Sequence, residues 1–175
     1  GVFPIGIDAA EFSSQAMHSA VNERVQTLKA EGQSLLLGVD RLDYTKGILR
    51  KLLAFERLLA DFPAHREKVR LLQIAVPSRE GVEAYQSFRR DVEQLVTRIN
   101  GQFGTAAWTP IQYLHQSQDR NELLALYRAA DLMLVTPLRD GMNLVAKEFV
   151  AARNDQCGVL VLCQFAGAVD EMGEA

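Results

Sequence analysis

Short apolar runs alternate with longer amphipathic segments along this chain, and this alternation limits its possible folds more than any other feature. The apolar runs are typical of buried strands and cover residues 34–39, 69–76, 110–115, 132–137 and 158–163. The other segments carry apolar side chains at helical spacing, over residues 11–30, 48–62, 80–99, 119–130 and 141–153. This order predicts an α/β domain, a parallel sheet with helices on both faces.

The composition is that of an ordinary globular domain, and it excludes some classes of partner. The chain has 175 residues, of which 48% are hydrophobic and 23% charged, enough for one domain with a sizeable core. Its net charge of −3 offers no general positive field, so neither nucleic acid nor an anionic membrane is an expected partner. No apolar run reaches membrane-spanning length. Any site for an anion must therefore be local.

The two cysteines and the two ends of the chain bear on its location and completeness. Cys157 and Cys163 would be too far apart on one extended strand to form a disulfide, so we expect buried thiols in a reducing compartment. The start has no basic region followed by an apolar one, which together with the thiols predicts a cytoplasmic protein. The chain begins with Gly1, and a last helix is predicted from Asp170, so we expect a processed or excised piece, truncated at its C-terminus.

The unusual residues of the sequence fall in loops on one side of the predicted sheet. In parallel α/β sheets, ligands bind at the carboxyl ends of the strands. Here those ends correspond to residues 40–47, 77–81, 115–119 and 136–144. The loops expected at the opposite edge carry no comparable residues, so we expect the site among these four.

The first of these loops holds two basic residues. Arg41 could hold a phosphate oxygen through its planar guanidinium, and Lys46 could do so as a point charge. Gly47 would let the backbone pass close to a ligand or enter the next helix. The alternative is a solvated loop in which Asp40 and Asp43 pair with the two bases, and the spacing leaves both interpretations open.

The fourth loop places a glycine before a predicted helix. The backbone N–H groups of Met142, Asn143 and Leu144 would then point out of the helix start and attract phosphate or sugar oxygens. Asp140 could accept hydrogen bonds from sugar hydroxyls, or it could be the N-cap of this helix.

Glu148 lies about two helical turns beyond Asp140, near the same face of the predicted helix. It stands among apolar residues, which makes it a candidate for the site. The alternative is an exposed acid that pairs with Lys147 or Arg153.

The remaining signals are weaker. Arg79, in the second loop, could contact an anion or be an ordinary surface residue. His18 and His115 are interpreted as structural, and no cluster of metal ligands is recognisable. The motifs G-x-G-x-x-G, G-x-x-x-x-G-K-[ST] and G-x-S-x-G are absent, which disfavours nicotinamide-dinucleotide folds, P-loop NTPases and α/β hydrolases.

Six long segments carry a resemblance to a known family. They read FPIGID (3–8), GVDRLDYTKGI (38–48), LQIAVPSREGVEAYQ (72–86), RINGQFGTAAWTPI (98–111), TPLRDGMNLVAKEFVAA (136–152) and GVLVLCQFAGAVDEM (158–172). With these segments the chain resembles the trehalose-6-phosphate synthases, retaining glycosyltransferases of family 20, over nearly its whole length. The resemblance implies the GT-B fold, in which two Rossmann-like domains flank the active site.

The resemblance also implies roles for individual residues. Arg41 and Lys46 match the pair that holds the donor diphosphate and stabilises the leaving group. Asp140 and residues 141–145 match the loop that holds the donor sugar and phosphate. These residues are Gly141, Met142, Asn143, Leu144 and Val145.

Three further positions follow from the same resemblance. Glu148 matches the acid that contacts the ribose hydroxyls, and Arg79 matches an arginine that contacts the acceptor phosphate. Gln118 stands near the nucleotide, where a bacterial member of the family has phenylalanine, so the preferred base stays open. Asp140 is not assigned as a nucleophile.

For the chain as a whole, the resemblance implies that residues 1–175 form part of the nucleotide-sugar-binding domain, without the N-terminal acceptor domain. The implied reaction transfers glucose from UDP-glucose to glucose 6-phosphate, with no metal or other cofactor. The parent enzyme could be a homo-oligomer, and this piece alone is expected to be inactive. Two alternatives stay open, namely a glucosylglycerol-phosphate synthase with another acceptor and a non-catalytic regulatory member of the family.

Overall fold

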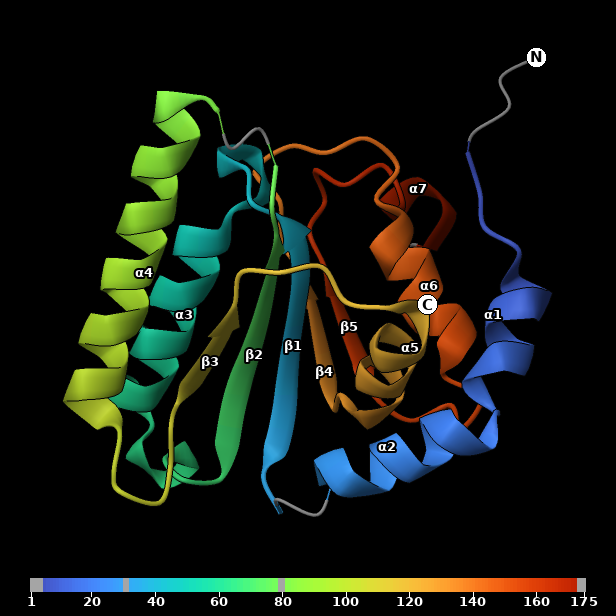
Figure 1. Ribbon diagram of the computed structural model, residues 1–175, viewed down its shortest axis with the longest axis horizontal. Coiled ribbons are helices and arrows are strands. Elements are labelled where there is room, and N and C mark those ends of the chain that lie inside the picture. The colour runs from blue at the N-terminus through green and yellow to red at the C-terminus, as the bar shows by residue number, and fades with distance from the viewer. Residues whose placement is uncertain (1–4, 30–31, 79–80, 173–175) are drawn as a thin grey trace.

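A computed structural model describes residues 5–29, 32–78 and 81–172, and over these residues the chain forms one five-stranded parallel sheet. The strand order is β3-β2-β1-β4-β5 (Figure 1). The strands are β1 (Ser34–Arg41), β2 (Val69–Val76), β3 (Ile111–Leu114), β4 (Leu132–Val135) and β5 (Val159–Leu162). The predicted α/β class with a parallel sheet is confirmed.

Helices connect the strands in the predicted order. The α-helices are α1 (Ala9–Ala16), α2 (Ser19–Lys29), α3 (Ile48–Asp61), α4 (Glu83–Phe103), α5 (Arg120–Ala129), α6 (Leu144–Ala152) and α7 (Val169–Met172). Two 3-10 turns, η1 (Tyr44–Lys46) and η2 (Pro63–His65), precede and follow α3. The single helix predicted over 11–30 is wrong, because the chain breaks between α1 and α2 at Met17 and His18.

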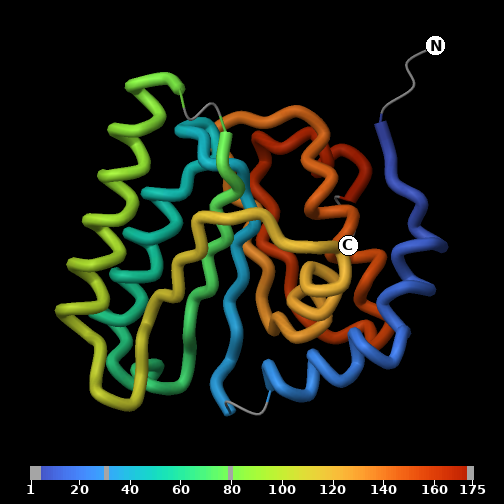
Figure 2. Tube along the Cα trace, in the orientation of Figure 1, coloured from blue at the N-terminus to red at the C-terminus, as the bar shows by residue number. Residues whose placement is uncertain are grey.

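The helices form a layer on each face of the sheet. Helices α3 and α4 cover one face, and α1, α2, α5 and α6 lie on the other (Figures 1 and 2). Successive residues of β2 alternate between the two cores: Leu71 packs in the α3–α4 core, and Leu72 packs in the core on the opposite face. A strand buried on both faces has no polar alternation, which explains its continuous apolar run.

The order of the strands creates a switch point beside β1. The chain builds the sheet from β1 through β2 to β3, and then returns to place β4 on the other side of β1. The loops that follow β1 and β4 therefore lead to helices on opposite faces of the sheet, and ligands of parallel α/β sheets bind at such a point. Two of the four predicted loops lie at this place.

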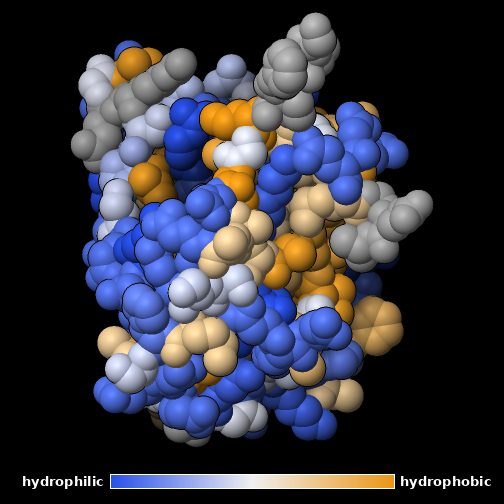
Figure 3. Space-filling view, turned by 90° about the vertical axis from the view of Figure 1, so that its right-hand side faces the viewer, coloured by the Kyte–Doolittle hydropathy of each residue, from blue (hydrophilic) through white to orange (hydrophobic). Residues whose placement is uncertain are grey.

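The cysteines and the surface complete the description. Both cysteines are free thiols, but Cys157 is exposed, so the prediction of two buried thiols is wrong. Cys157 lies in the turn before β5 and not within the strand. Among the described helices, none combines the length and the apolar character that crossing a bilayer requires. The side that carries α1 is mostly hydrophilic around a band of apolar side chains (Figure 3).

Candidate functional site

Two loops meet at the switch point and are joined by their backbones. One connects β1 to α3, and the other connects β4 to α6. The amide of Leu138 donates to the carbonyl of Thr45 at 2.7 Å. A Cβ atom on Gly47 would lie 2.4 Å from the carbonyl oxygen of Thr136, so only glycine fits this approach. Gly47 also has a φ of 70°, which glycine adopts without strain.

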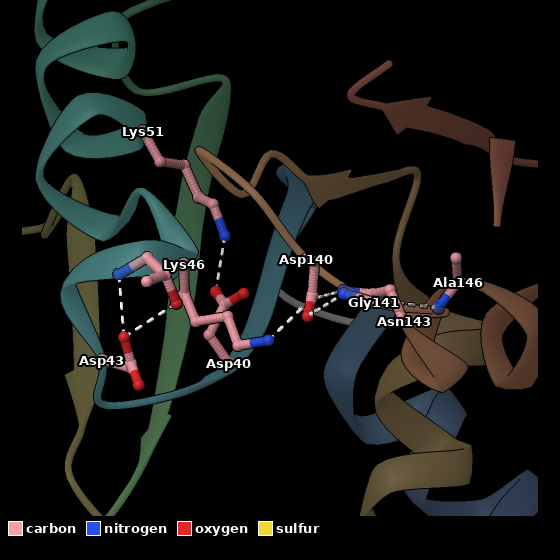
Figure 4. A network of polar contacts seen from close by, with 9 residues as sticks. Asp40, Asp43, Lys46, Lys51, Asp140, Gly141, Asn143 and Ala146 are labelled. Carbon is pink, nitrogen blue, oxygen red and sulfur yellow. Dashed lines mark hydrogen bonds and ion pairs between the residues drawn. The ribbon is translucent and has the colours of Figure 1, made fainter. Parts of the chain in front are cut away.

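A nearly buried ion pair crosses from one loop to the other. The Nζ atom of Lys46 lies 2.6 Å from Oδ2 of Asp140 (Figure 4), and only 10% and 15% of the two side chains are exposed. Lys46 therefore pairs with an acid of the second loop. The alternative in which it pairs with Asp40 or Asp43 is wrong.

The two acids of the first loop have other partners. Asp43 caps η1, where it accepts hydrogen bonds from the amide and the hydroxyl of Thr45, each at 2.8 Å. Asp40 is buried and accepts from Lys51 of α3 at 2.7 Å. The structure places Arg41 at the end of β1, exposed. Within the described part of the chain it makes no hydrogen bond or ion pair, and it acts on Asp43 only through its charge.

The second loop ends in a tight turn that is held from two sides. Asp140 accepts from the amide of Gly141 at 2.9 Å and from Nδ2 of Asn143 at 2.8 Å. The carbonyl of Gly141 accepts from the amide of Gly167 at 2.6 Å, and the amide of Asp140 donates to Phe165 at 3.0 Å. The Asp140 carboxylate therefore accepts from three groups, Nζ of Lys46, the amide of Gly141 and Nδ2 of Asn143, and both of its oxygens are engaged.

The helix after this turn begins later than predicted. Asn143 is its N-cap, with a φ of 58° and with Oδ1 accepting from the amide of Ala146 at 3.2 Å. The alternative in which Asp140 is the N-cap is therefore wrong, as is the argument that places it on the same helical face as Glu148. With Asn143 as the N-cap, the first amides within the helix belong to Leu144 and Val145, and Met142 precedes the helix.

Glu148 is half-buried on α6 and has a partner on a neighbouring helix. Its Oε2 accepts a hydrogen bond from the hydroxyl of Tyr127 on α5 at 2.9 Å. Lys147 pairs instead with Glu171 at 2.6 Å, and Arg153 pairs with Asp155 at 3.0 Å. The alternative in which Glu148 is an exposed acid paired with Lys147 or Arg153 is wrong.

The other two predicted positions are not joined to these loops by any described contact. Gln118 follows β3, half-buried, and its Nε2 is buried without a hydrogen-bond partner among the described residues. Arg79 lies outside the described residues, so its role stays a prediction. No group of three or more His, Cys, Asp and Glu residues within the described ranges is placed to hold a metal ion.

Comparison with known proteins decides the family. The sequence model that describes the family Glycosyltransferase family 20 matches residues 1–175 of this chain. The chain belongs to glycosyltransferase family 20. The trehalose-6-phosphate synthase of Mycobacterium avium (strain 104) is 51% identical over an alignment 178 residues long, which covers 100% of this chain and 36% of that protein.

Solved structures of family 20 members share the fold. The trehalose-6-phosphate synthase from E. coli bound with UDP-2-fluoro glucose superimposes with a TM-score of 0.94 at 46% identity, over 100% of this chain and 39% of that one. A UDP-forming synthase from Burkholderia xenovorans in complex with glucose-6-phosphate gives 0.92 at 47% identity, over 98% and 38%. The chain thus spans less than two fifths of the length of these relatives.

Sequence reasoning missed three residues around the candidate site. Lys51 interrupts the apolar stripe of α3, between Ile48 and Leu52, where a charged residue is unexpected. Gln73 interrupts the apolar run of β2. Both irregularities could have indicated a buried polar network. Tyr127, in contrast, lies on the apolar face of α5 and gave no signal.

Tyr127→Phe is expected to lower the free energy of unfolding by about 1–3 kcal/mol, because the half-buried Glu148 carboxylate would lose a donor. Urea unfolding at pH 7 measures this change. Tyr113→Phe is the matched control, because the Tyr113 hydroxyl is buried with no partner among the described residues. Its removal is expected to be neutral or slightly stabilising. Equal losses for the two variants would show that the Tyr127–Glu148 contact contributes nothing.

Acid is expected to lower the stability of the domain through Asp140, in the loop between β4 and α6. Burial raises the pKa of the Asp140 carboxyl, but hydrogen bonds from Lys46, Asn143 and the Gly141 amide outweigh it and hold the pKa below 3.8. A carboxyl with a depressed pKa stabilises the fold above its unfolded value, and this contribution is lost as the pH falls through the folded value. The free energy of unfolding should therefore decrease as the pH falls below 3.8.

Urea unfolding of the wild type and of Asp140→Asn between pH 7 and pH 3 tests this expectation. The variant should depend less steeply on acid than the wild type, whereas Asp91→Asn, which changes an exposed acid of α4, should not differ from it. Parallel curves for all three proteins would contradict the assigned role of Asp140.

Proposed function

We propose that this chain forms the donor-binding part of a retaining glucosyltransferase, which transfers glucose from UDP-glucose to glucose 6-phosphate to give trehalose 6-phosphate. The observation that carries the proposal is the Lys46–Asp140 pair, which joins the two switch-point loops beside an exposed Arg41. Family 20 membership and relatives that are trehalose-6-phosphate synthases support it. The solved relatives hold a UDP-glucose analogue and glucose-6-phosphate.

The donor diphosphate would lie against the positive groups of the two loops. The Arg41 guanidinium can bind two phosphate oxygens at once, and the Lys46 ammonium adds a fixed charge. The start of α6 presents the amides of Leu144 and Val145, where the helix dipole favours an anion. The Asp140 oxygens and Glu148 would accept hydrogen bonds from the hydroxyls of the glucose and of the ribose.

The chemistry asked of these residues is mainly electrostatic. When the bond between the anomeric carbon and the UDP oxygen breaks, negative charge develops on the diphosphate, and fixed cations oppose this charge. The acceptor hydroxyl forms the new bond on the same face of the sugar, and its proton passes to the departing phosphate. No protein carboxylate attacks the sugar, so Asp140 holds Lys46 and the donor and is not a nucleophile. No metal or other cofactor is needed for these steps.

The acceptor would be bound by the other half of a GT-B enzyme. Since this chain spans 36% of the Mycobacterium avium relative, the proposal assigns donor binding alone to it. We expect these 175 residues to bind UDP weakly and to form no trehalose 6-phosphate by themselves.

Calorimetric titration of the chain with UDP, GDP and ADP tests the proposal, followed by product analysis with a full-length enzyme that contains this domain. We expect UDP to bind, and glucose 6-phosphate to be preferred to glycerol 3-phosphate as acceptor. Transfer should continue in the presence of EDTA. Failure to bind any nucleotide would overturn the proposed donor site and favour a regulatory role, and a preference for glycerol 3-phosphate would reassign the acceptor.

A further inference from the structure

A buried polar network lies directly beneath the two loops. Oδ2 of Asp40, on β1, accepts from Nζ of Lys51 at 2.7 Å and from Nε2 of Gln73 at 2.9 Å. Gln73 also donates to the carbonyl of Ile74 at 3.0 Å. The Lys51 and Asp40 side chains are only 2% and 3% exposed. Residues from β1, β2 and α3 therefore meet at one carboxylate (Figure 4 shows Asp40 and Lys51).

The network is not explained by stability alone. Its neighbours on α3, Ile48 and Leu52, are fully buried apolar residues. Removing two charges from water is costly, and a well-packed apolar pair of similar volume is often as stable as a buried ion pair. Asp40 and Lys51 nevertheless occupy this core, so stability alone does not explain why the two positions are charged.

The strand beside the network leaves space for it. A Cβ atom on Gly38, in the middle of β1, would lie 2.4 Å from Oε1 of Gln73 and 2.8 Å from Nζ of Lys51. Glycine within a central strand is normally unfavourable, because it has no side chain to pack and loses more conformational entropy on folding than other residues. At this position glycine allows the polar side chains to cross the strand.

The network closes the base of the loop that carries the cations. Asp40 directly precedes Arg41, the last residue of β1 before the loop. Lys51 lies in the first turns of α3, just after Lys46, and its amide donates to the carbonyl of Gly47 at 3.0 Å. The Asp40–Lys51 contact therefore ties the strand before the loop to the helix after it, and both cations lie in the segment between these two points.

We propose that Asp40, Lys51 and Gln73 are positioning residues that hold the Arg41–Lys46 loop in the geometry needed for transfer. The proposal rests on the donor-binding function described above. Hydrogen bonds and an ion pair are directional, so they set the angle between the end of β1 and the start of α3, whereas an apolar pair would fill the same volume without setting it. The three side chains are buried, so they would act through Arg41 and Lys46 and not by direct contact with the donor.

The test is the double variant Asp40→Leu/Lys51→Met in a full-length enzyme that contains this domain. It keeps the volume of the pair and leaves no charge unpaired, so we expect a melting temperature close to that of the parent. Because small misplacements of reacting groups are costly, we expect kcat to fall about 10–100-fold while KM for UDP-glucose changes much less. A merely structural pair would not produce this split between kcat and KM.

Two control variants complete the design. Lys51→Arg keeps the ion pair and should retain most of the turnover. Arg57→Gln/Asp61→Asn removes an exposed pair, 3.0 Å apart, from the same helix and should leave kcat unchanged.

A double variant of parental melting temperature and parental kcat would overturn the proposal. If the double variant does not fold, Gln73→Met decides instead. It removes the amide that donates to Asp40 and to the Ile74 carbonyl, and it leaves the Asp40–Lys51 pair in place. A lower kcat with unchanged KM supports the proposal, and an unchanged kcat overturns it. A parent enzyme that neither binds UDP nor transfers glucose would show instead that the proposed function is wrong.

Discussion

Arg41→Ala, in a full-length enzyme that contains this domain, is expected to lower kcat by about 10²–10³-fold, the usual effect of removing one preorganised group that stabilises transition-state charge. The structure places Arg41 at the end of β1, exposed and without a hydrogen bond or ion pair among the described residues. Its guanidinium is therefore free to meet charge that develops on the diphosphate. Steady-state kinetics with UDP-glucose and glucose 6-phosphate measure the effect.

The same exposure predicts that the variant folds normally. Since Arg41 holds no partner in the described fold, its loss should leave the melting temperature close to that of the wild type. Arg57→Ala is the matched control, because this arginine on α3 is 83% exposed and lies outside the two loops. Arg41→Lys should recover only part of the activity, since an ammonium cannot bind two oxygens in one plane. A kcat within a few-fold of the wild type for Arg41→Ala would refute the assigned role.

Gly47→Ala is expected to destabilise the domain and to abolish UDP binding by this chain. The left-handed backbone of Gly47, with φ of 70°, would cost a side chain about 1–3 kcal/mol. The new Cβ would also lie 2.4 Å from the Thr136 carbonyl oxygen, and neither backbone can yield cheaply. The two loops would have to separate, which breaks the Leu138–Thr45 hydrogen bond and pulls Lys46 from Asp140. Urea unfolding and calorimetric titration with UDP measure both effects.

Two other glycines separate the causes. Gly32 has a φ of 69° but nothing within 4 Å of an added Cβ, so Gly32→Ala should lose only the part due to backbone strain. Gly101, inside α4, also has open space, and Gly101→Ala should stabilise the domain by about 0.5–1 kcal/mol. If Gly47→Ala is no more destabilising than Gly32→Ala, the close approach of the two loops does not matter.

The sequence predicted the elements better than it predicted their contacts. The strand over 69–76 was predicted at its observed bounds, because an apolar run between a charged segment and a proline has only one consistent interpretation. The strand predicted over 34–39 extends to Arg41, since Asp40 and Arg41 continue the pairing with β2 despite their charge. Pairing between strands is a long-range property, and local hydropathy does not report it.

The choice of partners for the charged residues required the tertiary structure. Asp40 and Asp43 lie in the same short loop segment as Arg41 and Lys46, yet Lys46 pairs with an acid 94 positions away. Many pairings of acids and bases satisfy one sequence, and only the relative placement of the strands selects among them. The contact between Tyr127 and Glu148 is of the same kind, because it joins α5 and α6 across the intervening β4, and no pattern within either helix reports it.

By itself, the sequence determined the alternation of strands and helices, the family, and the edge of the sheet at which the candidate site is placed. These follow from side-chain periodicity and from the rule that parallel strands end at one edge, both of which are local or topological. The tertiary structure decided that α6 begins after Asn143 and that Lys46 faces Asp140. The physical reason lies in backbone contacts between loops that are distant in sequence. The amide of Gly167 donates to the carbonyl of Gly141, and Gly47 lets the carbonyl of Thr136 approach closely. No pattern within either loop encodes its distance to the other.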